Sequence, residues 1–262
     1  MAEAPEGARH YTGLVVEAYD LWLEQNPPGD EPFYRGYLEE GGEPALEVAC
    51  GTGRLLLEYV AEGFDVDGVD ASEPMLERCR EKAAARGLDP ALYLQPMEGL
   101  DLPRRYRTLF VPYGSLQALV DFDDLEAALQ GFREHLVPGG RLVVALFVPG
   151  EELDPLPRWR IRREATRPDE ATILMHEAVD YDRAEQVLTA WYRYEVVGED
   201  GRIARAEMRK MRQRWFEENE FRLLLEAAGL EPVRTHGDYG AEPYGEEHSE
   251  LVWVARRPDA AG

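Results

Sequence analysis

The first 150 residues alternate short apolar runs with stretches in which apolar residues recur three and four positions apart. Strands that alternate with helices in this way are typical of βαβ units and a parallel sheet. A helix is predicted over residues 9–25 and ends at the turn-forming segment 26–32. The strands expected after it are 44–49, 65–70, 92–95, 108–112 and 141–148, and the helices between them are 54–62, 72–86 and 123–136.

The pattern changes after Pro149. Three later segments are rich in aromatic and β-branched residues, with charges alternating along them, as in antiparallel strands with two unlike faces. These segments are 172–181, 187–197 and 203–214, and a helix over 216–228 and strands over 230–235 and 251–255 follow them. We therefore expect a core of residues 1–152 and 215–262, interrupted by an antiparallel β insertion of residues 153–214.

The chain is strongly acidic, with 52 Asp and Glu residues against 29 Lys and Arg residues and a formal net charge of −23. Nucleic acids and anionic lipid surfaces attract proteins through clustered basic residues, so we expect neither of them as a partner. The longest apolar run, 142–148, is about a third of the length of a membrane-spanning helix. The N-terminal residues lack the basic and apolar regions of a signal peptide, and a cytoplasmic protein is expected.

Several kinds of catalytic or metal site have no counterpart in the sequence. Cys50 and Cys79 are the only cysteines, too few for a disulfide scaffold. The five histidines occur singly, without the spacing of metal ligands, so no metal is expected. Neither the phosphate-binding GxxxxGK[ST] motif nor a G-x-S-x-G nucleophile elbow is present.

The most informative segment is a predicted strand that runs into Gly51-Thr52-Gly53, immediately before a helix. Glycine allows a sharp backbone turn and a close approach by a ligand. The next strand ends at Asp70, seventeen positions after Gly53, where a carboxylate can accept hydrogen bonds from the ribose hydroxyls of a nucleoside cofactor. A plain tight turn and a helix cap are the alternative interpretations, although Ser72 already suits the cap. Together the two features favour a nucleoside cofactor.

The glycine pattern also bears on which nucleoside is bound. A dinucleotide-binding turn has a third glycine, and Leu56 stands at that position. A nicotinamide-dependent dehydrogenase is therefore the weaker alternative.

Three segments, EVACGTG, GVDASEPML and LVPGGRLVV, resemble motifs of the class I S-adenosylmethionine-dependent methyltransferases. Within that family the chain is most similar to small-molecule N- or O-methyltransferases that act on amino sugars and antibiotics, because of Tyr19-Asp20, the 112–115 segment and the β insertion. The resemblance implies an α/β fold, a Rossmann-like doubly wound seven-stranded sheet of order 3-2-1-4-5-7-6 with strand seven antiparallel. It also implies S-adenosylmethionine as the cofactor and methyl transfer to a nitrogen or oxygen of a metabolite.

The resemblance also assigns roles in cofactor binding. Gly51 and Gly53 would lie under the methionine part, Asp70 would hold the ribose, and Ala71 and Met75 would flank the adenine. Glu47 would neutralise the ammonium group of the cofactor. Proline stands at position 96, where the family often has an acidic residue, so the adenine is expected to meet the Met97 amide and the side chain of Gln95 or Glu98. The full predicted set is Tyr11, Tyr19, Glu47, Ala49, Cys50, Gly51, Gly53, Asp70, Ala71, Met75, Gln95, Pro96, Met97, Glu98 and Pro112.

Methyl transfer from a sulfonium depends mainly on alignment of the acceptor, and alignment alone can supply roughly 7–11 kcal/mol of a barrier. The predicted catalytic residues are Tyr19, Tyr113 and His176. Tyr11 and Tyr19 are eight positions apart and are expected on one face of the first helix, as ligands or as core aromatics. Glu177, His236 and His248 are further candidates for a base.

The insertion has two candidate roles, because its large amphipathic side chains suit either a lid over the acceptor or a homodimer contact. The basic run 158–163 is either a binding patch for an anionic acceptor or the solvated face of a strand. A module that binds the cofactor without transferring methyl groups is the alternative that involves no catalysis.

Overall fold

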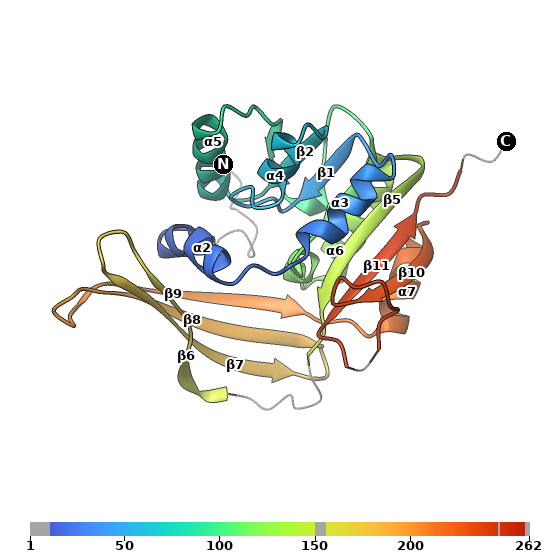
Figure 1. Cartoon of the computed structure of the whole chain (residues 1–262). Coiled ribbons are helices and arrows are strands. Elements are labelled where there is room, and N and C mark those ends of the chain that lie inside the picture. The colour runs from blue at the N-terminus through green and yellow to red at the C-terminus, as the bar shows by residue number, and fades with distance from the viewer. Residues whose placement is uncertain (1–10, 150–155, 246, 260–262) are drawn as a thin grey trace.

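The structure is a computed structural model, and it describes residues 11–149, 156–245 and 247–259. The chain forms two sheets, a central seven-stranded sheet with helices on both faces and a four-stranded sheet beside it (Figure 1). The helix α2 (Leu14–Gln25) lies between the four-stranded sheet and the rest of the chain. The expected domain boundary at residues 152 and 153 lies outside the described residues.

The seven strands have the order β10-β11-β5-β4-β1-β2-β3. Their bounds are β1 (Ala45–Val48), β2 (Val66–Asp70), β3 (Leu92–Leu94), β4 (Tyr106–Val111), β5 (Leu136–Phe147), β10 (Glu231–Gly237) and β11 (Glu250–Arg256). Strand β11 is antiparallel to both of its neighbours, and the other pairs are parallel. Numbered within this sheet alone, the order is 3-2-1-4-5-7-6 with strand seven antiparallel, so the predicted fold class is confirmed.

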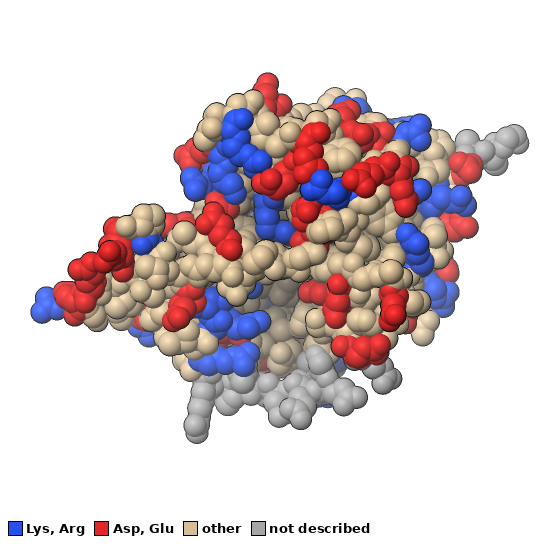
Figure 2. All heavy atoms as spheres, in the orientation of Figure 1, with Lys and Arg blue, Asp and Glu red and all other residues tan. Residues whose placement is uncertain are grey.

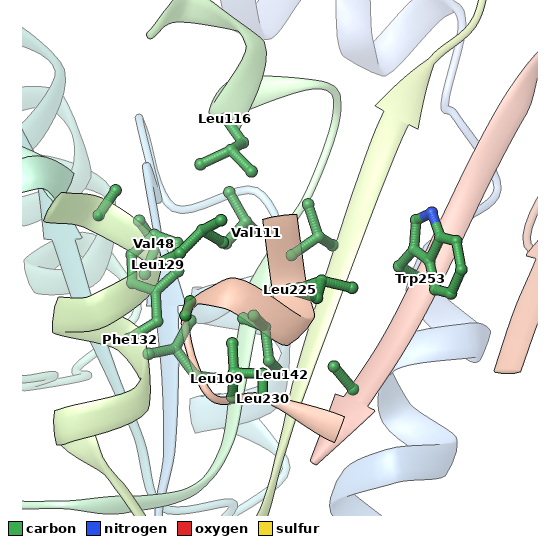
Figure 3. Packing of buried hydrophobic residues seen from close by; sticks show 14 of the residues in the cluster. Val48, Leu109, Val111, Leu116, Leu129, Phe132, Leu142, Leu225, Leu230 and Trp253 are labelled. Atoms are coloured by element: carbon green, nitrogen blue, oxygen red, sulfur yellow. The ribbon is translucent and has the colours of Figure 1, made fainter. Parts of the chain in front are cut away.

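Alternation along the central strands builds one hydrophobic cluster on each face of the sheet. On one face, Leu109 and Leu142 pack against helices α6 (Phe122–His135) and α7 (Glu218–Ala227) (Figure 3). On the other face, Phe110 and Val143 pack against α3 (Glu31–Glu39), α4 (Leu56–Ala61) and α5 (Glu73–Ala85). The sheet is therefore covered on both sides, and its strand ends remain available for a site. Two short 3-10 helices, η1 (Met97–Gly99) and η2 (Ser115–Ala118), follow β3 and β4.

The four-stranded sheet is an antiparallel meander of β6 (Leu156–Thr166), β7 (Thr172–Asp182), β8 (Val187–Val197) and β9 (Ile203–Arg214). One face of it carries Ile173, Met175 and Tyr194, which pack against α2. Trp22 of α2 stacks on Tyr194 with the ring centroids 5.7 Å apart. The first helix thus rests on the insertion and joins the two sheets. Strand β6 contains the basic run 158–163, for which the face of a strand was one of the two interpretations.

Three local expectations need correction. Helix α2 begins at Leu14, so Tyr11 precedes the helix and does not share a helical face with Tyr19. The segment 26–32 ends one helix but also begins α3, because Pro32 occupies its first turn, where no backbone N–H donor is needed. Strand β5 begins at Leu136, earlier than the expected start at residue 141, and its register with β4 is irregular. Among the described helices, none is long and apolar enough to cross a membrane.

Candidate functional site

A cavity lies at the carboxyl ends of β1, β2 and β4, where the chain order of the strands reverses between β1 and β4. Open α/β sheets bind ligands at this kind of switch point. The cavity is lined by Tyr11, Tyr19, Val48, Ala49, Gly51, Val69, Asp70, Ala71, Met75, Gln95, Met97, Glu98, residues 113–115, residues 118–121, Asp124, Met211 and Gln213. Most of these residues follow core strands, and the last two belong to β9.

The two glycines of the turn after β1 have different surroundings, although both have positive φ angles, 56° at Gly51 and 79° at Gly53. A Cβ atom on Gly51 would have one neighbour within 4 Å, a ring carbon of Tyr19 at 3.9 Å. A Cβ atom on Gly53 would lie 2.6 Å from Cys79 Sγ and 2.8 Å from Leu57 Cγ. Gly51 therefore leaves room in the cavity, whereas Gly53 allows α4 and α5 to pack closely behind the turn.

Asp70 ends β2 and is held by the backbone on both oxygens. The Gly51 N–H donates to Oδ2 and the Ser72 N–H donates to Oδ1, each at 2.8 Å. Each carboxylate oxygen retains acceptor capacity beyond one such bond, and Asp70 lines the cavity. Burial raises the pKa of Asp70 and the two N–H groups oppose that rise. Ser72, not Asp70, caps α5, since its hydroxyl accepts from the Met75 N–H. The carboxylate is thus fixed in place to receive hydroxyl donors.

Helix α2 is tied to the glycine turn by a buried polar contact. The Thr52 hydroxyl donates to Asp20 Oδ1 at 2.5 Å, and the Lys82 ammonium donates to the same oxygen at 2.8 Å. Asp20 is buried, and the contact fixes the neighbouring Tyr19 beside Gly51. The Tyr19-Asp20 pair noted in the sequence therefore has one residue in the cavity and one that anchors the helix.

Three tyrosines surround the end of the cavity next to the four-stranded sheet. Tyr11 and Tyr19 meet edge to face with ring centroids 6.2 Å apart, and Tyr113 follows β4 in a left-handed conformation with φ of 60°. Burial raises the pKa of Tyr11 to about 12 and raises that of Tyr19 further. The Tyr11 and Tyr19 phenols are therefore protonated at neutral pH and act as hydrogen-bonding groups, not as bases.

The opposite end of the cavity is acidic. Burial raises the pKa of Glu98, and Asp124 of α6 adds to the effect. The Gln95 side chain donates to the Asp101 carbonyl at 3.0 Å and accepts from the Asp101 N–H at 2.8 Å. These two hydrogen bonds occupy both the nitrogen and the oxygen of the Gln95 amide. Of the two predicted side chains, Glu98 is therefore better placed to accept a hydrogen bond from an adenine amino group.

Six predicted site residues are not among the residues that line the cavity: Glu47, Cys50, Gly53, Pro96, Pro112 and His176. Of the predicted catalytic residues, His176 is the one that lies outside the cavity. It alternates along β7 with the buried Met175 and Glu177, and so lies on the sheet face away from α2. Its Nε2 atom is 2.9 Å from Glu195 Oε2, which gives it a structural partner on the next strand.

The other histidines considered as bases also have structural contacts. His236 bonds through Nδ1 to the Gly240 carbonyl at 2.7 Å and through Nε2 to the Tyr37 hydroxyl at 3.2 Å. The Gly245 N–H donates to His248 Nδ1 at 3.0 Å. Neither histidine lines the cavity.

Glu47 is buried in the middle of β1, and its Oε2 atom has no hydrogen-bond partner among the described residues. Desolvation raises its pKa to about 8, although Arg54 opposes the rise. Arg54 itself makes two hydrogen bonds to Asp30, at 2.6 and 2.7 Å. A cationic group of a ligand near Glu47 would favour the ionised carboxylate.

Sequence reasoning missed the cavity wall formed by residues 118–121, Asp124, Met211 and Gln213. The segment 112–115 was singled out from the sequence. Residues 118–121 continue the same loop toward α6, so they could have been included in the predicted site. Met211 and Gln213 are two positions apart and lie on the same face of β9. No local pattern in the sequence indicates that this face turns toward the core. Among the described residues, no group of three potential metal ligands is present.

Known proteins resemble both the core and the whole chain. A family model described as a methyltransferase domain matches residues 45–140. A dTDP-3-amino-3,4,6-trideoxy-alpha-D-glucopyranose N,N-dimethyltransferase of Streptomyces venezuelae is 35% identical over 99 residues, 38% of this chain and 40% of that relative. The chain spans 40%, 50% and 53% of the first three curated relatives that it matches.

Two further similarities extend over nearly the full length. A cypemycin N-terminal methyltransferase of Streptomyces sp is 26% identical over 94% of this chain and 97% of the relative. The solved CcbJ methyltransferase from Streptomyces caelestis superposes with a TM-score of 0.78 at 29% identity, over 98% of this chain and 100% of that one. The strand order and the glycine turn joined to an acidic residue on β2 define a Rossmann-like methyltransferase fold. The chain thus resembles a methyltransferase domain over residues 45–140 and shares the fold of a solved methyltransferase over nearly its full length.

Proposed function

We propose that this chain is an enzyme that transfers a methyl group from S-adenosylmethionine to an amine nitrogen of a small molecule. The observation that carries the proposal is the pairing of Gly51 with Asp70. The glycine leaves room in the cavity where a side chain would otherwise project, and the Asp70 carboxylate beside it is fixed by two backbone donors. This combination suits a nucleoside whose ribose hydroxyls donate hydrogen bonds.

Each part of the cofactor has a chemically suitable partner in this chain. Asp70 would accept from the ribose hydroxyls, and Ala71 and Met75 would contact the adenine ring. Glu98 would accept from the adenine amino group, and Gly51 would lie beneath the methionine part. When bound, S-adenosylmethionine supplies a methyl group made electrophilic by its sulfonium.

The tyrosine end of the cavity would receive the acceptor. Tyr11, Tyr19 and Tyr113 offer hydrogen-bonding phenols there, and Met211 and Gln213 of β9 close that side against water. None of His176, His236 and His248 lines the cavity, and burial keeps Tyr11 and Tyr19 protonated. An amine can lose its proton to water before it enters, whereas a hydroxyl needs a base in the site. This contrast favours nitrogen over oxygen.

Two of the relatives support an amine acceptor. The names of the matched sugar enzyme and of the cypemycin enzyme describe methylation of an amino sugar and of an N-terminus. We further propose that the insertion, 153–214, covers the acceptor. A homodimer contact and a cytoplasmic location remain predictions, and the net charge of −23 argues against nucleic acid as the acceptor.

The test has two steps. Thermal-shift titration with S-adenosylmethionine and S-adenosylhomocysteine should raise the melting temperature. Transfer of a labelled methyl group should then be measured on a library that contains each compound as an amine and as the matching alcohol. Labelled amines support the proposal, labelled alcohols would replace nitrogen by oxygen, and binding without any transfer would favour a module without catalytic activity.

A further inference from the structure

Resting on the proposed function, we propose that Arg163 of β6 binds an anionic group, a carboxylate or a phosphate, that the acceptor carries in addition to its amine. The inference comes from a cation that has no carboxylate partner among the described residues and lies beside the tyrosine end of the cavity. Figure 2 shows a hollow between the four-stranded sheet and the core, with Lys and Arg side chains on the sheet at its edge.

Arg163 reaches the acceptor end of the cavity from the insertion. Its Nη2 atom donates to the Tyr113 hydroxyl at 3.1 Å, and Tyr113 lines the cavity. Its guanidinium lies over the Trp22 ring, 6.0 Å from the centroid. The phenols of Tyr11, Tyr19, Tyr192 and Tyr194 also interact with it electrostatically. The cation thus lies among aromatic rings, directly behind the residue that would contact the acceptor.

Among the described residues, no carboxylate forms an ion pair with Arg163 at a distance below 4 Å. The contrast with the rest of β6 is clear. Arg160 Nη2 lies 3.2 Å from Glu177 Oε2, and Arg162 Nε lies 3.7 Å from the same oxygen. Arg167, one residue past the strand, lies 2.7 Å from Glu17. Among the described arginine side chains of β6, Arg163 is therefore the one without a carboxylate partner, and its charge can bind an anionic ligand.

A partly buried cation without a counter-ion carries a desolvation cost that its single phenol contact offsets only in part. An anion on the acceptor would remove that cost, and the planar guanidinium can hold a carboxylate or a phosphate through two donors. The strongly negative protein would otherwise repel such an acceptor. A localised arginine at the cavity thus permits an anionic substrate on an acidic surface.

The decisive experiment titrates S-adenosylhomocysteine-saturated protein with inorganic phosphate and, separately, with acetate at constant ionic strength, monitored by NMR. Arg163→Gln should weaken binding of the preferred anion about tenfold to a hundredfold, as expected for a charge-assisted hydrogen bond, and Arg163→Lys should recover part of it. Arg202→Gln is the control, because it removes the same charge at a different place in the chain. The Arg202 side chain is 88% exposed and lies beside Asp200 in the turn between β8 and β9. The preferred anion, phosphate or acetate, identifies the group on the acceptor.

Anion binding that Arg163→Gln leaves unchanged would overturn the inference, and so would the absence of anion binding by the wild-type protein. A tenfold loss of S-adenosylhomocysteine affinity in Arg163→Gln would also overturn it, since Arg163 would then bind the carboxylate of the cofactor. Failure of the wild-type protein to bind S-adenosylhomocysteine would instead refute the proposed function, so the two failures are distinguishable. In the transfer assay, amines with a carboxylate or phosphate should be methylated in preference to matched neutral amines, and Arg163→Gln should remove that preference through KM.

Discussion

The seven-stranded core and the four-stranded sheet line the same cavity in different ways. The core supplies the turn after β1, the end of β2 and the loops after β3 and β4, all at the carboxyl edge of parallel strands. The four-stranded sheet supplies Met211 and Gln213 from within β9, and Arg163 approaches Tyr113 from within β6. The family match, residues 45–140, ends before the first strand of the second sheet.

This difference suits the recognition of two different ligands, the cofactor and the acceptor. Turns at strand ends hold a cofactor by backbone geometry, which tolerates little change because a glycine and a fixed carboxylate are required. Side chains on the face of an antiparallel sheet can change one by one without altering the backbone, which suits recognition of an acceptor. We infer that the core determines which cofactor is bound and that the second sheet determines which amine is methylated.

The largest expected effect is on the core side, from Gly51→Val. Its side chain would occupy cavity space beside Tyr19, so binding of S-adenosylhomocysteine should be lost in isothermal titration. The φ angle of 56° also makes the valine strained, and some loss of stability is expected. Gly87→Val is the matched control, because Gly87 has a φ of 68° with open space around it. It should lose stability but bind normally, and normal binding by Gly51→Val would place the turn away from the cofactor.

Trp22→Ala should be next in size, because it tests the contact that joins the two regions. Trp22 is buried and stacks on Tyr194 of β8, and truncation of a buried tryptophan costs about 3–5 kcal/mol of unfolding free energy. Since α2 also carries Tyr19, cofactor affinity should fall as well. Urea unfolding and titration measure the two effects. Leu223→Ala, at a residue 56% exposed, should change neither, and an unaffected Trp22→Ala would mean that α2 is held by the core alone.

Asp70→Ala should weaken S-adenosylmethionine binding by about 1.5–3 kcal/mol, the usual contribution of hydrogen bonds to a charged acceptor. The Gly51 and Ser72 N–H groups would also lose their partner, so a smaller loss of stability should accompany it. Calorimetry on the folded variant gives the affinity. An unchanged affinity would remove Asp70 from the cofactor site.

The smallest expected effect is a proton released when S-adenosylmethionine binds. The buried Glu47 has a pKa of about 8, so at pH 7 it is largely protonated, and the nearby ammonium of the cofactor would ionise it. Binding at pH 7 should therefore release part of a proton and strengthen as the pH rises toward 8. Calorimetry in buffers of different ionisation enthalpy measures the release, and Glu47→Gln should abolish it. An equal release in Glu47→Gln would exclude a pairing of Glu47 with the ammonium.

The same group makes stability depend on pH. Between its usual pKa of 4.5 and about 8, the folded chain holds a proton that the unfolded chain has lost. The free energy of unfolding should accordingly fall as the pH rises through this window. Glu47→Gln should flatten that slope in urea unfolding measured across the window, and an unaltered slope would assign the dependence to other groups.

The sequence predicts the core well because its signals are local. A buried strand followed by Gly51 and a second strand ending at Asp70 specify both the fold and the cofactor site, and Ser72 marks the start of α5. Helix α3 was missed because Pro32 looks like a helix stop, although proline is equally suited to a first turn. The roles of Met211, Gln213 and Arg163 depend on the register and orientation of β6 and β9 against the core, which are set by long-range packing that no local pattern encodes.

Hydrogen exchange with and without S-adenosylhomocysteine tests the division between core and sheet most directly. We expect strong protection of the turn around Gly51 and of residues 69–75, with weaker protection of α2 and of the part of β9 near Met211. The strands β6, β7 and β8 should exchange at the same rate in both states. Protection concentrated in β6 to β8, with no change around Gly51 and Asp70, would contradict the assignment of the cofactor to the core.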